Sequence, residues 1–185
     1  DEPAPNGGVI NMGCYGGTDE ASKSGDLKVY LYKGIAIVDS FRTITGAVGS
    51  IPVTLDDDYT VEINSNDTFN EQVSIIKRNN SSAYSLTIKP GDGYHPIIDG
   101  NTYAFYIKPD GNYDLFNVTL EGLEITSTTA QGIYVNYTST SYNVQYLTIK
   151  DCNIHGTTGF GIYARYAYYT TFENNLIYNT GSAYA

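Results

Sequence analysis

Two short strand patterns alternate along the second half of the chain with one common period. The segment Gly132–Val135 recurs 29 residues later as Gly161–Ala164, and both copies begin Gly-Ile-Tyr. A second pattern, Leu120–Ile125, recurs in the same register as Ile149–Ile154 and again as Phe172–Ile177. A period of 21 to 29 residues is too long for a hairpin meander and too short for two parallel strands joined by a helix. The repeat therefore predicts a coil of stacked turns.

Alternation within these strands predicts which side chains face the interior of the coil. In 105–107, 133–135 and 162–164 the first and last residues are expected to point inward. The outward positions would then stack as one row, made of Tyr106, Tyr134, Tyr163 and Tyr184. Such a row either packs ring against ring and shields the sheet, or offers an aromatic surface to a partner chain or to sugar rings.

The first 58 residues follow other patterns. Residues 1–26 hold a short apolar stretch among prolines and glycines, which predicts an extended arm, and residues 27–39 predict one or two strands. Ser40–Ile51 predicts a short helix capped by Ser40, with an apolar face formed by Phe41, Ile44, Val48 and Ile51. We expect three regions: the arm over 1–26, a strand plus capping helix over 27–58, and a coil of about five turns over 59–185.

Several segments carry a resemblance to a known family. They are Phe69–Val73, Pro96–Gly100, Gly122–Ile125, Asn174–Tyr178 and the two Gly-Ile-Tyr strands. With these, residues 40–185 resemble the right-handed parallel β-helix proteins, the pectate-lyase-like superfamily in its broad sense. The resemblance implies an all-β, right-handed parallel β-helix.

The arm resembles a different part of such proteins. Pro3–Gly13, followed by Tyr15–Thr18, is similar to the segment that closes the C-terminal end of secreted β-helix domains in large repetitive surface proteins. Here it stands first in the chain, so the order looks permuted. This resemblance implies an extracellular or cell-surface protein.

Arm and coil together suggest assembly. The repeat places the end of the chain inside a strand, which leaves an open turn at Ser182, Ala183, Tyr184 and Ala185. The arm of another copy could complete that turn through Val9, Ile10, Asn11, Met12, Cys14 and Tyr15. Head-to-tail joining of this kind builds a filament, so the sequence predicts a structural subunit whose partners are copies of itself. The alternative within this hypothesis is a tandem β-helix array in one longer chain.

A carbohydrate-active β-helix protein is the competing hypothesis, either a polysaccharide lyase or hydrolase or a non-catalytic glycan-binding module. Acid–base catalysis would need carboxylates gathered beside a cation or across a cleft. Only Lys150 and Arg165 lie in the well-aligned turns, and the acidic candidates are scattered: Asp99, Asp110, Asp114, Glu121, Glu124, Asp151 and Glu173. The sequence therefore favours a non-enzymatic role and assigns no catalytic residue.

Charge and composition limit the classes of partner and cofactor that we expect this chain to bind. Ten basic and twenty acidic residues give a formal net charge of −10, which disfavours nucleic acid, and no apolar stretch is long enough to insert into a membrane. The run Asp56-Asp57-Asp58 is a weak Ca²⁺ candidate, although adjacent carboxylates more often form a solvated turn. We expect no cofactor.

Two kinds of modification remain open. Cys152 falls at an inward position and is expected to be a buried thiol, while Cys14 lies in the arm, so a bridge between them is undecided. Acceptor motifs for N-linked sugar occur at Asn66, Asn79, Asn80, Asn117 and Asn136.

Overall fold

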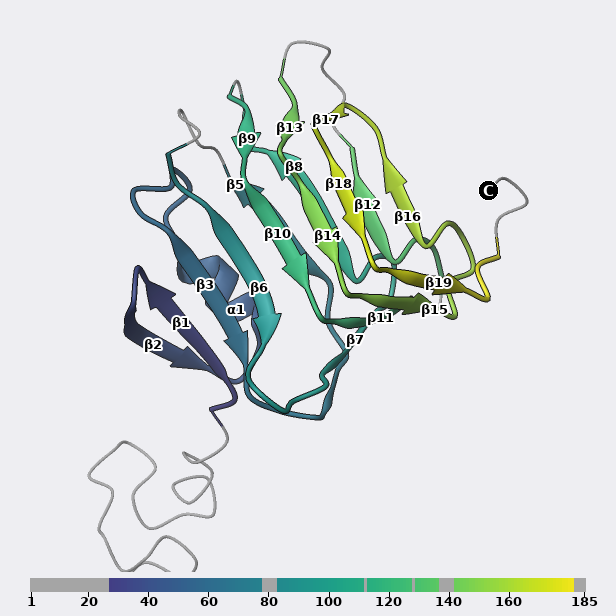
Figure 1. Ribbon diagram of the computed structural model, residues 1–185, viewed down its shortest axis with the longest axis horizontal. Helices are drawn as coiled ribbons and strands as arrows, with labels where there is room; N and C mark the ends of the chain where they lie inside the picture. Colours follow the sequence, from purple (N-terminus) through teal and green to yellow (C-terminus); the bar gives the residue numbers. More distant parts are fainter. Residues whose placement is uncertain (1–26, 78–82, 112, 128, 137–141, 182–185) are drawn as a thin grey trace, which may run out of the picture.

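The computed structural model describes residues 27–77, 83–111, 113–127, 129–136 and 142–181. Most of them form a coil of short parallel strands, arranged in four sheets that run along its length (Figure 1). The first sheet contains five parallel strands: β3 (Tyr59–Ile63), β6 (Leu86–Pro90), β10 (Val118–Glu121), β14 (Thr148–Lys150) and β18 (Thr171–Glu173). The second contains β4 (Thr68–Phe69), β7 (Ile97–Gly100), β11 (Glu124–Ser127), β15 (Asn153–His155) and β19 (Leu176–Tyr178).

The other two sheets are smaller. The third contains β5 (Val73–Lys77), β8 (Phe105–Pro109), β12 (Ile133–Val135) and β16 (Ile162–Ala164). The fourth contains β9 (Leu115–Phe116), β13 (Val144–Gln145) and β17 (Ala167–Tyr168).

The number of complete turns is smaller than the repeat predicts. Among the described residues, three turns carry a strand in every sheet: β6 to β9, β10 to β13 and β14 to β17. The strands β3 to β5 precede them, and β18 and β19 follow them. The expected five turns therefore become three complete turns with a partial turn at each end. The two numbers differ because the repeat in the sequence counts a turn wherever one strand pattern recurs, whereas a complete turn has a strand in each of the four sheets.

Alternate side chains fill the coil. In the first sheet Ile88, Leu120 and Ile149 lie directly above one another, and none is exposed. The inward positions expected at 105, 107, 133 and 135 are also fully buried. At β16 the expectation fails, because Ile162 is half-buried and Ala164 is exposed. Alternation sets the direction of a side chain, but burial also requires a neighbouring strand on the outer side, and no described strand lies there.

A hairpin continues the first sheet beyond its first parallel strand. It contains β1 (Val29–Lys33) and β2 (Ala36–Phe41), joined through Gly34 at φ 58°. β1 pairs antiparallel with both β3 and β2, so the seven strands run in the order β18-β14-β10-β6-β3-β1-β2. The region expected to hold one or two strands therefore contains two.

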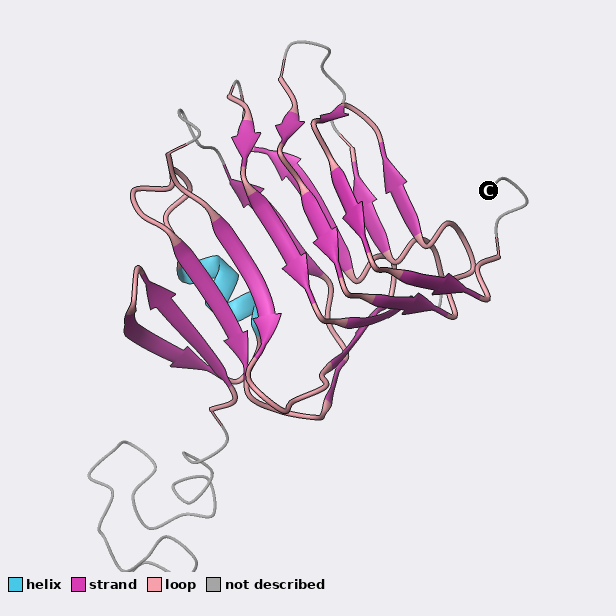
Figure 2. Cartoon of the chain, in the orientation of Figure 1, coloured by secondary structure: helices cyan, strands magenta, loops and turns pink. Residues whose placement is uncertain are grey.

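The helix α1 (Ile44–Ser50), cyan in Figure 2, begins later than the sequence predicts. Its N-cap is Thr43, whose Oγ1 accepts a hydrogen bond from Gly46 N at 3.0 Å, and not Ser40. The Ser40 prediction was wrong because residues 40 and 41 pair with β1 and belong to β2. The helix still buries Ile44, Ala47 and Val48 against the first turn, as a capping helix should.

Two side chains from the coil hold the ends of α1. The Glu71 carboxylate accepts hydrogen bonds from Ile44 N and Thr45 N, each at 2.8 Å, and so satisfies amides that the helix leaves unpaired. Beyond the last turn, Lys77 Nζ donates to Ile51 O at 2.6 Å. Lys77 is buried, and desolvation lowers the pKa of its ammonium group. The helix is thus fixed to the coil by hydrogen bonds as well as by apolar packing.

Candidate functional site

The C-terminal end of the described coil exposes side chains that are buried elsewhere. Ile177 lies directly above Ile154, yet Ile177 is 46% exposed and Ile154 is not exposed at all. Phe172 lies above the fully buried Ile149 and is 53% exposed. Leu176 adds a third exposed apolar side chain at this end. We call Phe172, Leu176 and Ile177 the open end. Phe172 and Ile177 present the cross-section of the core to solvent, and Leu176, in register with Asn153, lies beside them at an outward position.

The strands of the open end also have a free edge. β18 pairs with β14, and β19 pairs with β15. Each is the last strand of its sheet, so within the described part of the chain no strand accepts their remaining backbone groups. An exposed strand edge with apolar side chains is a template for pairing with another strand.

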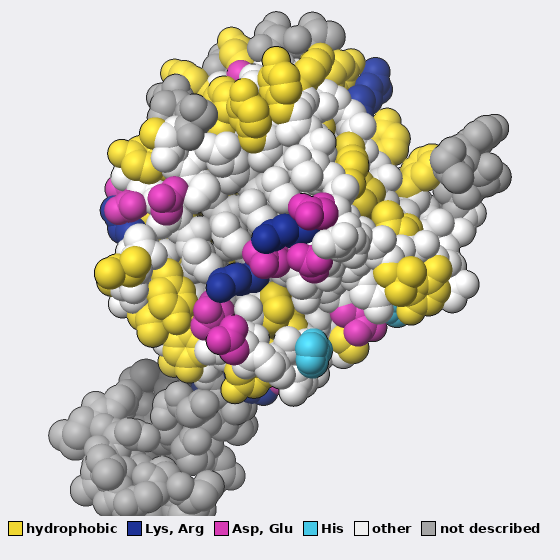
Figure 3. Space-filling view, in the orientation of Figure 1, with side chains coloured by type: hydrophobic (Ala, Val, Ile, Leu, Met, Phe, Trp, Pro, Cys, Tyr) yellow, Lys and Arg dark blue, Asp and Glu magenta, His cyan; other side chains and the backbone are white. Residues whose placement is uncertain are grey.

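Two polar rows cover the outer face of the first sheet. One consists of five threonines, one from each parallel strand: Thr60, Thr87, Thr119, Thr148 and Thr171. Two residues further along each strand, acidic and basic side chains alternate: Glu62, Lys89, Glu121, Lys150 and Glu173. Figure 3 shows magenta and dark-blue side chains alternating across this face.

Ion pairs link neighbours within the charged row. Lys89 Nζ lies 3.9 Å from Glu62 Oε2, and Lys150 Nζ lies 3.1 Å from Glu121 Oε1. Glu173 ends the row at the open end, in register with Lys150. The strand-by-strand repeat of Thr, an apolar residue, and Glu or Lys was visible in the sequence, but Glu62, Lys89 and the threonine row were missed. Repeat searching by residue identity overlooks positions that alternate between opposite charges.

An aromatic row lies outside the third sheet. Tyr134 stacks on Tyr163 with ring centroids 5.1 Å apart and an interplanar angle of 14°. Tyr106 lies 5.8 Å from Tyr134 and is tilted by 32°, while Tyr103 stacks more closely on Tyr134 at 4.4 Å. The expected row therefore includes Tyr103, which sequence reasoning missed, and Tyr184 lies outside the described residues. Because stacked rings cover one another's faces, the row offers mainly ring edges to solvent.

A second aromatic row lies at the corner beside the fourth sheet. Phe116 and Tyr146 have centroids 6.3 Å apart, and Tyr146 and Tyr169 have centroids 5.0 Å apart. Tyr146 and Tyr169 have positive φ angles of 56° and 53°, the left-handed conformation of a tight corner. Tyr169 is 70% exposed, so this row ends in an accessible ring.

Comparison with known proteins agrees with this geometry. A family model described as "Right handed beta helix region" matches residues 94–184, which contain the strands from β7 onward and the two complete turns β10 to β13 and β14 to β17. The chain is a right-handed parallel β-helix repeat protein. No curated protein and no solved structure matches it.

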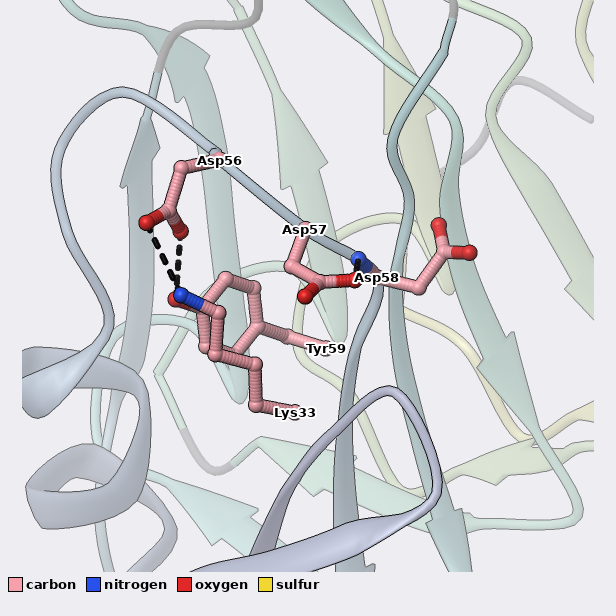
Figure 4. A network of polar contacts seen from close by, with 5 residues as sticks. All are labelled: Lys33, Asp56, Asp57, Asp58 and Tyr59. Atoms are coloured by element: carbon pink, nitrogen blue, oxygen red, sulfur yellow. Dashed lines mark hydrogen bonds and ion pairs between the residues drawn. The ribbon is translucent and has the colours of Figure 1, made fainter.

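The acidic run of this β-helix protein forms a turn whose carboxylates diverge (Figure 4). Asp56 accepts a hydrogen bond from the Tyr59 hydroxyl at 2.6 Å and pairs with Lys33 Nζ at 2.9 Å. Asp57 accepts from the next backbone amide, and Asp58 accepts from Ser85 N and Ser85 Oγ, each at 2.8 Å. The hydrogen bond from Tyr59 and then Lys33 lower the pKa of Asp56. Over the described ranges, no group of three or more His, Cys, Asp or Glu side chains is placed to hold a metal ion.

The acidic candidates for catalysis lie on several sides of the β-helix, and Glu121, Glu124 and Asp114 each have different partners. Glu124 pairs with His155 Nε2 at 2.9 Å on the second sheet, and Glu121 pairs with Lys150 on the first. Asp114 accepts from Asn143 N at 2.7 Å and from Gln145 Nε2 at 2.8 Å. Arg165, the other basic candidate, donates to the Tyr166 hydroxyl. These contacts give no arrangement of two carboxylates around one cleft.

An open hollow of about 340 Å³ lies beside the start of α1. Its lining includes both basic and acidic side chains: Lys28, Arg42, Asp67 and Glu71. Lys28 is paired with Asp67, and Glu71 caps the helix. Lys28, Asp67 and Glu71 therefore join the N-terminal cap to the coil.

The modification candidates are placed as follows. Cys152 is a free, buried thiol, and burial raises its pKa to about 11. Of the glycosylation candidates, Asn66 is exposed, whereas Asn117 Nδ2 donates to Tyr84 O and Asn136 Nδ2 donates to the Tyr134 hydroxyl. The remaining site predictions fall outside the described residues: Val9, Ile10, Asn11, Met12, Cys14, Tyr15, Asn79, Asn80, Ser182, Ala183, Tyr184 and Ala185.

Within the part of the chain that the structure covers, α1 is the one helix, and it is much too short to cross a bilayer.

Proposed function

We propose that this β-helix protein is a structural subunit of an extracellular or cell-surface assembly, in which copies join head to tail and the N-terminal arm helps to complete the open end of a neighbour. The observation that carries the proposal is the exposure of core positions at the open end. Ile177 and Phe172 occupy positions whose equivalents one turn earlier are completely buried. Burying such apolar area against another copy would contribute roughly 25 cal/mol per Å².

The position of the other end supports a head-to-tail arrangement. Lys28 N donates to Phe41 O at 3.0 Å, so residues 1–26 join the described chain beside the end of β2. That point lies at the capped end of the coil, opposite the open end (Figure 1). If copies stack along the coil axis, the arm of one copy leaves from the junction with its neighbour. A contact between two different ends does not close on itself and so gives a linear polymer.

Sedimentation velocity over a range of protein concentrations, with electron microscopy of the same samples, tests the proposal. We expect particles that grow with concentration and appear as filaments. Ile177→Asp should abolish growth, because it buries an unpaired charge at the junction. Tyr94→Asp is the matched control: Tyr94 is 37% exposed in the loop between β6 and β7, away from both ends, and its substitution should leave growth unchanged. A protein that stays monomeric at all concentrations would contradict the proposal.

Deletion of residues 1–18 tests the contribution of the arm separately. We expect the shortened protein to keep its thermal unfolding transition and to lose most of its ability to assemble. Assembly equal to that of the full chain would show that the open end is covered without the arm.

A glycan-binding module is the second candidate, and the accessible ring of Tyr169 favours it. Tyr146 covers one face of this ring, and the ring is well placed to stack on a sugar. Titration with acidic and neutral polysaccharides tests this function, with Tyr169→Ala expected to remove binding. Release of reducing or unsaturated sugar would instead indicate an enzyme.

A further inference from the structure

The first sheet runs along the whole coil and its cap, and among the described residues no strand pairs with the outer side of either of its edge strands. β18 is the edge at the open end, and β2 is the edge at the capped end. β2 is antiparallel to β1, and β1 is antiparallel to β3, so β2 points the same way as the parallel strands of the coil. The two edge strands of one sheet therefore have the same direction.

Both edges expose apolar side chains. On β2, Ile37 is 57% exposed and Val38 is 53% exposed, while α1 covers the core behind them. On β18, Phe172 is 53% exposed. Soluble proteins usually protect a sheet edge with charge, proline or a covering segment. Each edge carries one carboxylate, Asp39 on β2 and Glu173 on β18, and Asp39 accepts a hydrogen bond from Ser40 N at 2.8 Å, but no described strand pairs with either edge. Two such edges with matching strand direction fit the addition of one copy to the next.

We propose that β2 of one copy pairs in parallel with β18 of the next, so that the first sheet continues through the junction. This inference rests on the proposed head-to-tail assembly and identifies its partner as a second copy of the chain. The bonds that form are backbone hydrogen bonds between two edges, the mode by which a strand is added to an exposed sheet.

The outward rows predict the register of this pairing. Tyr32 pairs with Thr60 on one side and with Ile37 on the other, so Ile37 continues the threonine row. Tyr30 pairs with Glu62 and with Ser40, so Ser40 continues the charged row. The pairing of β1 with β2 shifts register between Leu31 and Tyr32, which leaves Val38 as an extra residue, so Ile37 and Ser40 are three residues apart whereas Thr171 and Glu173 are two apart. If the pairing keeps this bulge, continuing both rows across the junction places Ile37 beside Thr171 of the next copy and Ser40 beside Glu173. The Ser40 hydroxyl can then donate to the Glu173 carboxylate.

The charges near the two edges are compatible with this register. Asp39 pairs with the inward-facing Leu31, so Asp39 lies on the opposite face of the sheet from Glu173 and on the same face as Phe172. Its carboxylate accepts a hydrogen bond from Ser40 N at 2.8 Å. Arg42 is exposed and follows directly after the last residue of β2. Glu173 is the last residue of β18, so both side chains lie at the C-terminal end of their strands. The junction therefore brings a basic side chain, and not a second carboxylate, toward Glu173.

Cysteine cross-linking between two singly substituted proteins tests the pairing. Ile37→Cys and Thr171→Cys are each made in a Cys14→Ser background, mixed, oxidised mildly and separated without reductant. Adjacent strands bring Cα atoms within reach of a disulfide, so we expect a species of twice the chain mass of 20.2 kDa. In the matched control, Thr119→Cys replaces Thr171→Cys: Thr119 lies in the same row but in the middle of the sheet. That mixture should give no such species.

A charge on the edge gives an independent test. Ile37→Asp places a carboxylate on β2 and should prevent assembly, whereas Ile35→Asp, in the fully exposed hairpin turn just before β2, should not. If copies assemble but the two cysteines do not cross-link, or if Ile37→Cys cross-links mainly to itself, this strand pairing is wrong while head-to-tail assembly stands. If the unsubstituted protein never assembles, both proposals fail.

Discussion

At the N-terminal end of the coil, α1 and the β1–β2 hairpin lie over the first turn, and Ile44, Ala47 and Val48 are buried beneath the cap. At the other end, Phe172 and Ile177 occupy the same kind of inward position, yet they are exposed. The strands at the two ends have the same apolar alternation. The two ends differ in whether another described element lies on the outer side of the strand. A side chain at an inward position of a solenoid is therefore buried only where an adjacent turn or cap covers it.

The largest expected effect is on the free energy of unfolding, and it is seen by comparing Ile154 and Ile177, which lie one above the other in the second sheet. Ile154→Ala removes side-chain atoms from a fully buried site and should lower the free energy of unfolding by about 2–5 kcal/mol. Ile177→Ala acts at a site that is 46% exposed and should cost about 1 kcal/mol or less in the monomer. Urea denaturation of both variants at a concentration where the protein is monomeric measures the difference. Equal costs would mean that the open end is already covered.

A smaller effect is expected at the capped end. Glu71→Ala removes both hydrogen bonds to the first amides of α1 and should lower the free energy of unfolding by about 1–2 kcal/mol. Glu71→Gln keeps one acceptor oxygen and should cost less. Thermal unfolding of the two variants measures this order, and the reverse order would show that the cap does not depend on these bonds.

The smallest expected effect concerns the pH dependence of the turn beside the cap. The pKa of Asp56 is lowered in the folded protein by the hydrogen bond from Tyr59 and by Lys33. A lowered pKa stabilises the fold above the unfolded pKa of the carboxyl group, and this contribution disappears as the pH falls through the folded pKa. Asp56→Asn should therefore flatten the acid side of the stability profile. Urea midpoints between pH 2 and pH 6 test this, and an unchanged slope would show that the carboxylate is not coupled to folding.

The repeat in the sequence was sufficient to predict the fold. Gly132–Val135 and Gly161–Ala164 share backbone register because identical side chains favour stacking directly above one another, and the structure pairs Ile133 with Ile162 and Tyr134 with Tyr163. The all-β parallel β-helix and its short capping helix were therefore predicted correctly. Propensity placed Ser40 in the helix, whereas the antiparallel pairing of β2 with β1 keeps it in a strand. Local signals could not reveal that pairing.

The candidate site was less accessible to sequence reasoning. Alternation predicted that Ala164 points inward, but no local pattern shows whether a further turn covers it. Tyr103 joins the aromatic row from outside the regular strands, so the repeat gave no sign of it. The threonine row and the first two members of the charged row, Glu62 and Lys89, were present in the sequence, and aligning each strand by chemical type as well as by identity would have found them.

Hydrogen exchange of the edge strands at low and high protein concentration tests the central claim most directly. In the monomer, the amides of β18 and β19 should exchange much faster than those of β14 and β15, since free edges open easily. At high concentration we expect the amides of β18, β19 and β2 to become protected together, while β14 and β15 change little. Protection of β18 and β19 that is already high in the monomer, or that does not change with concentration, would contradict an end that is completed by another copy.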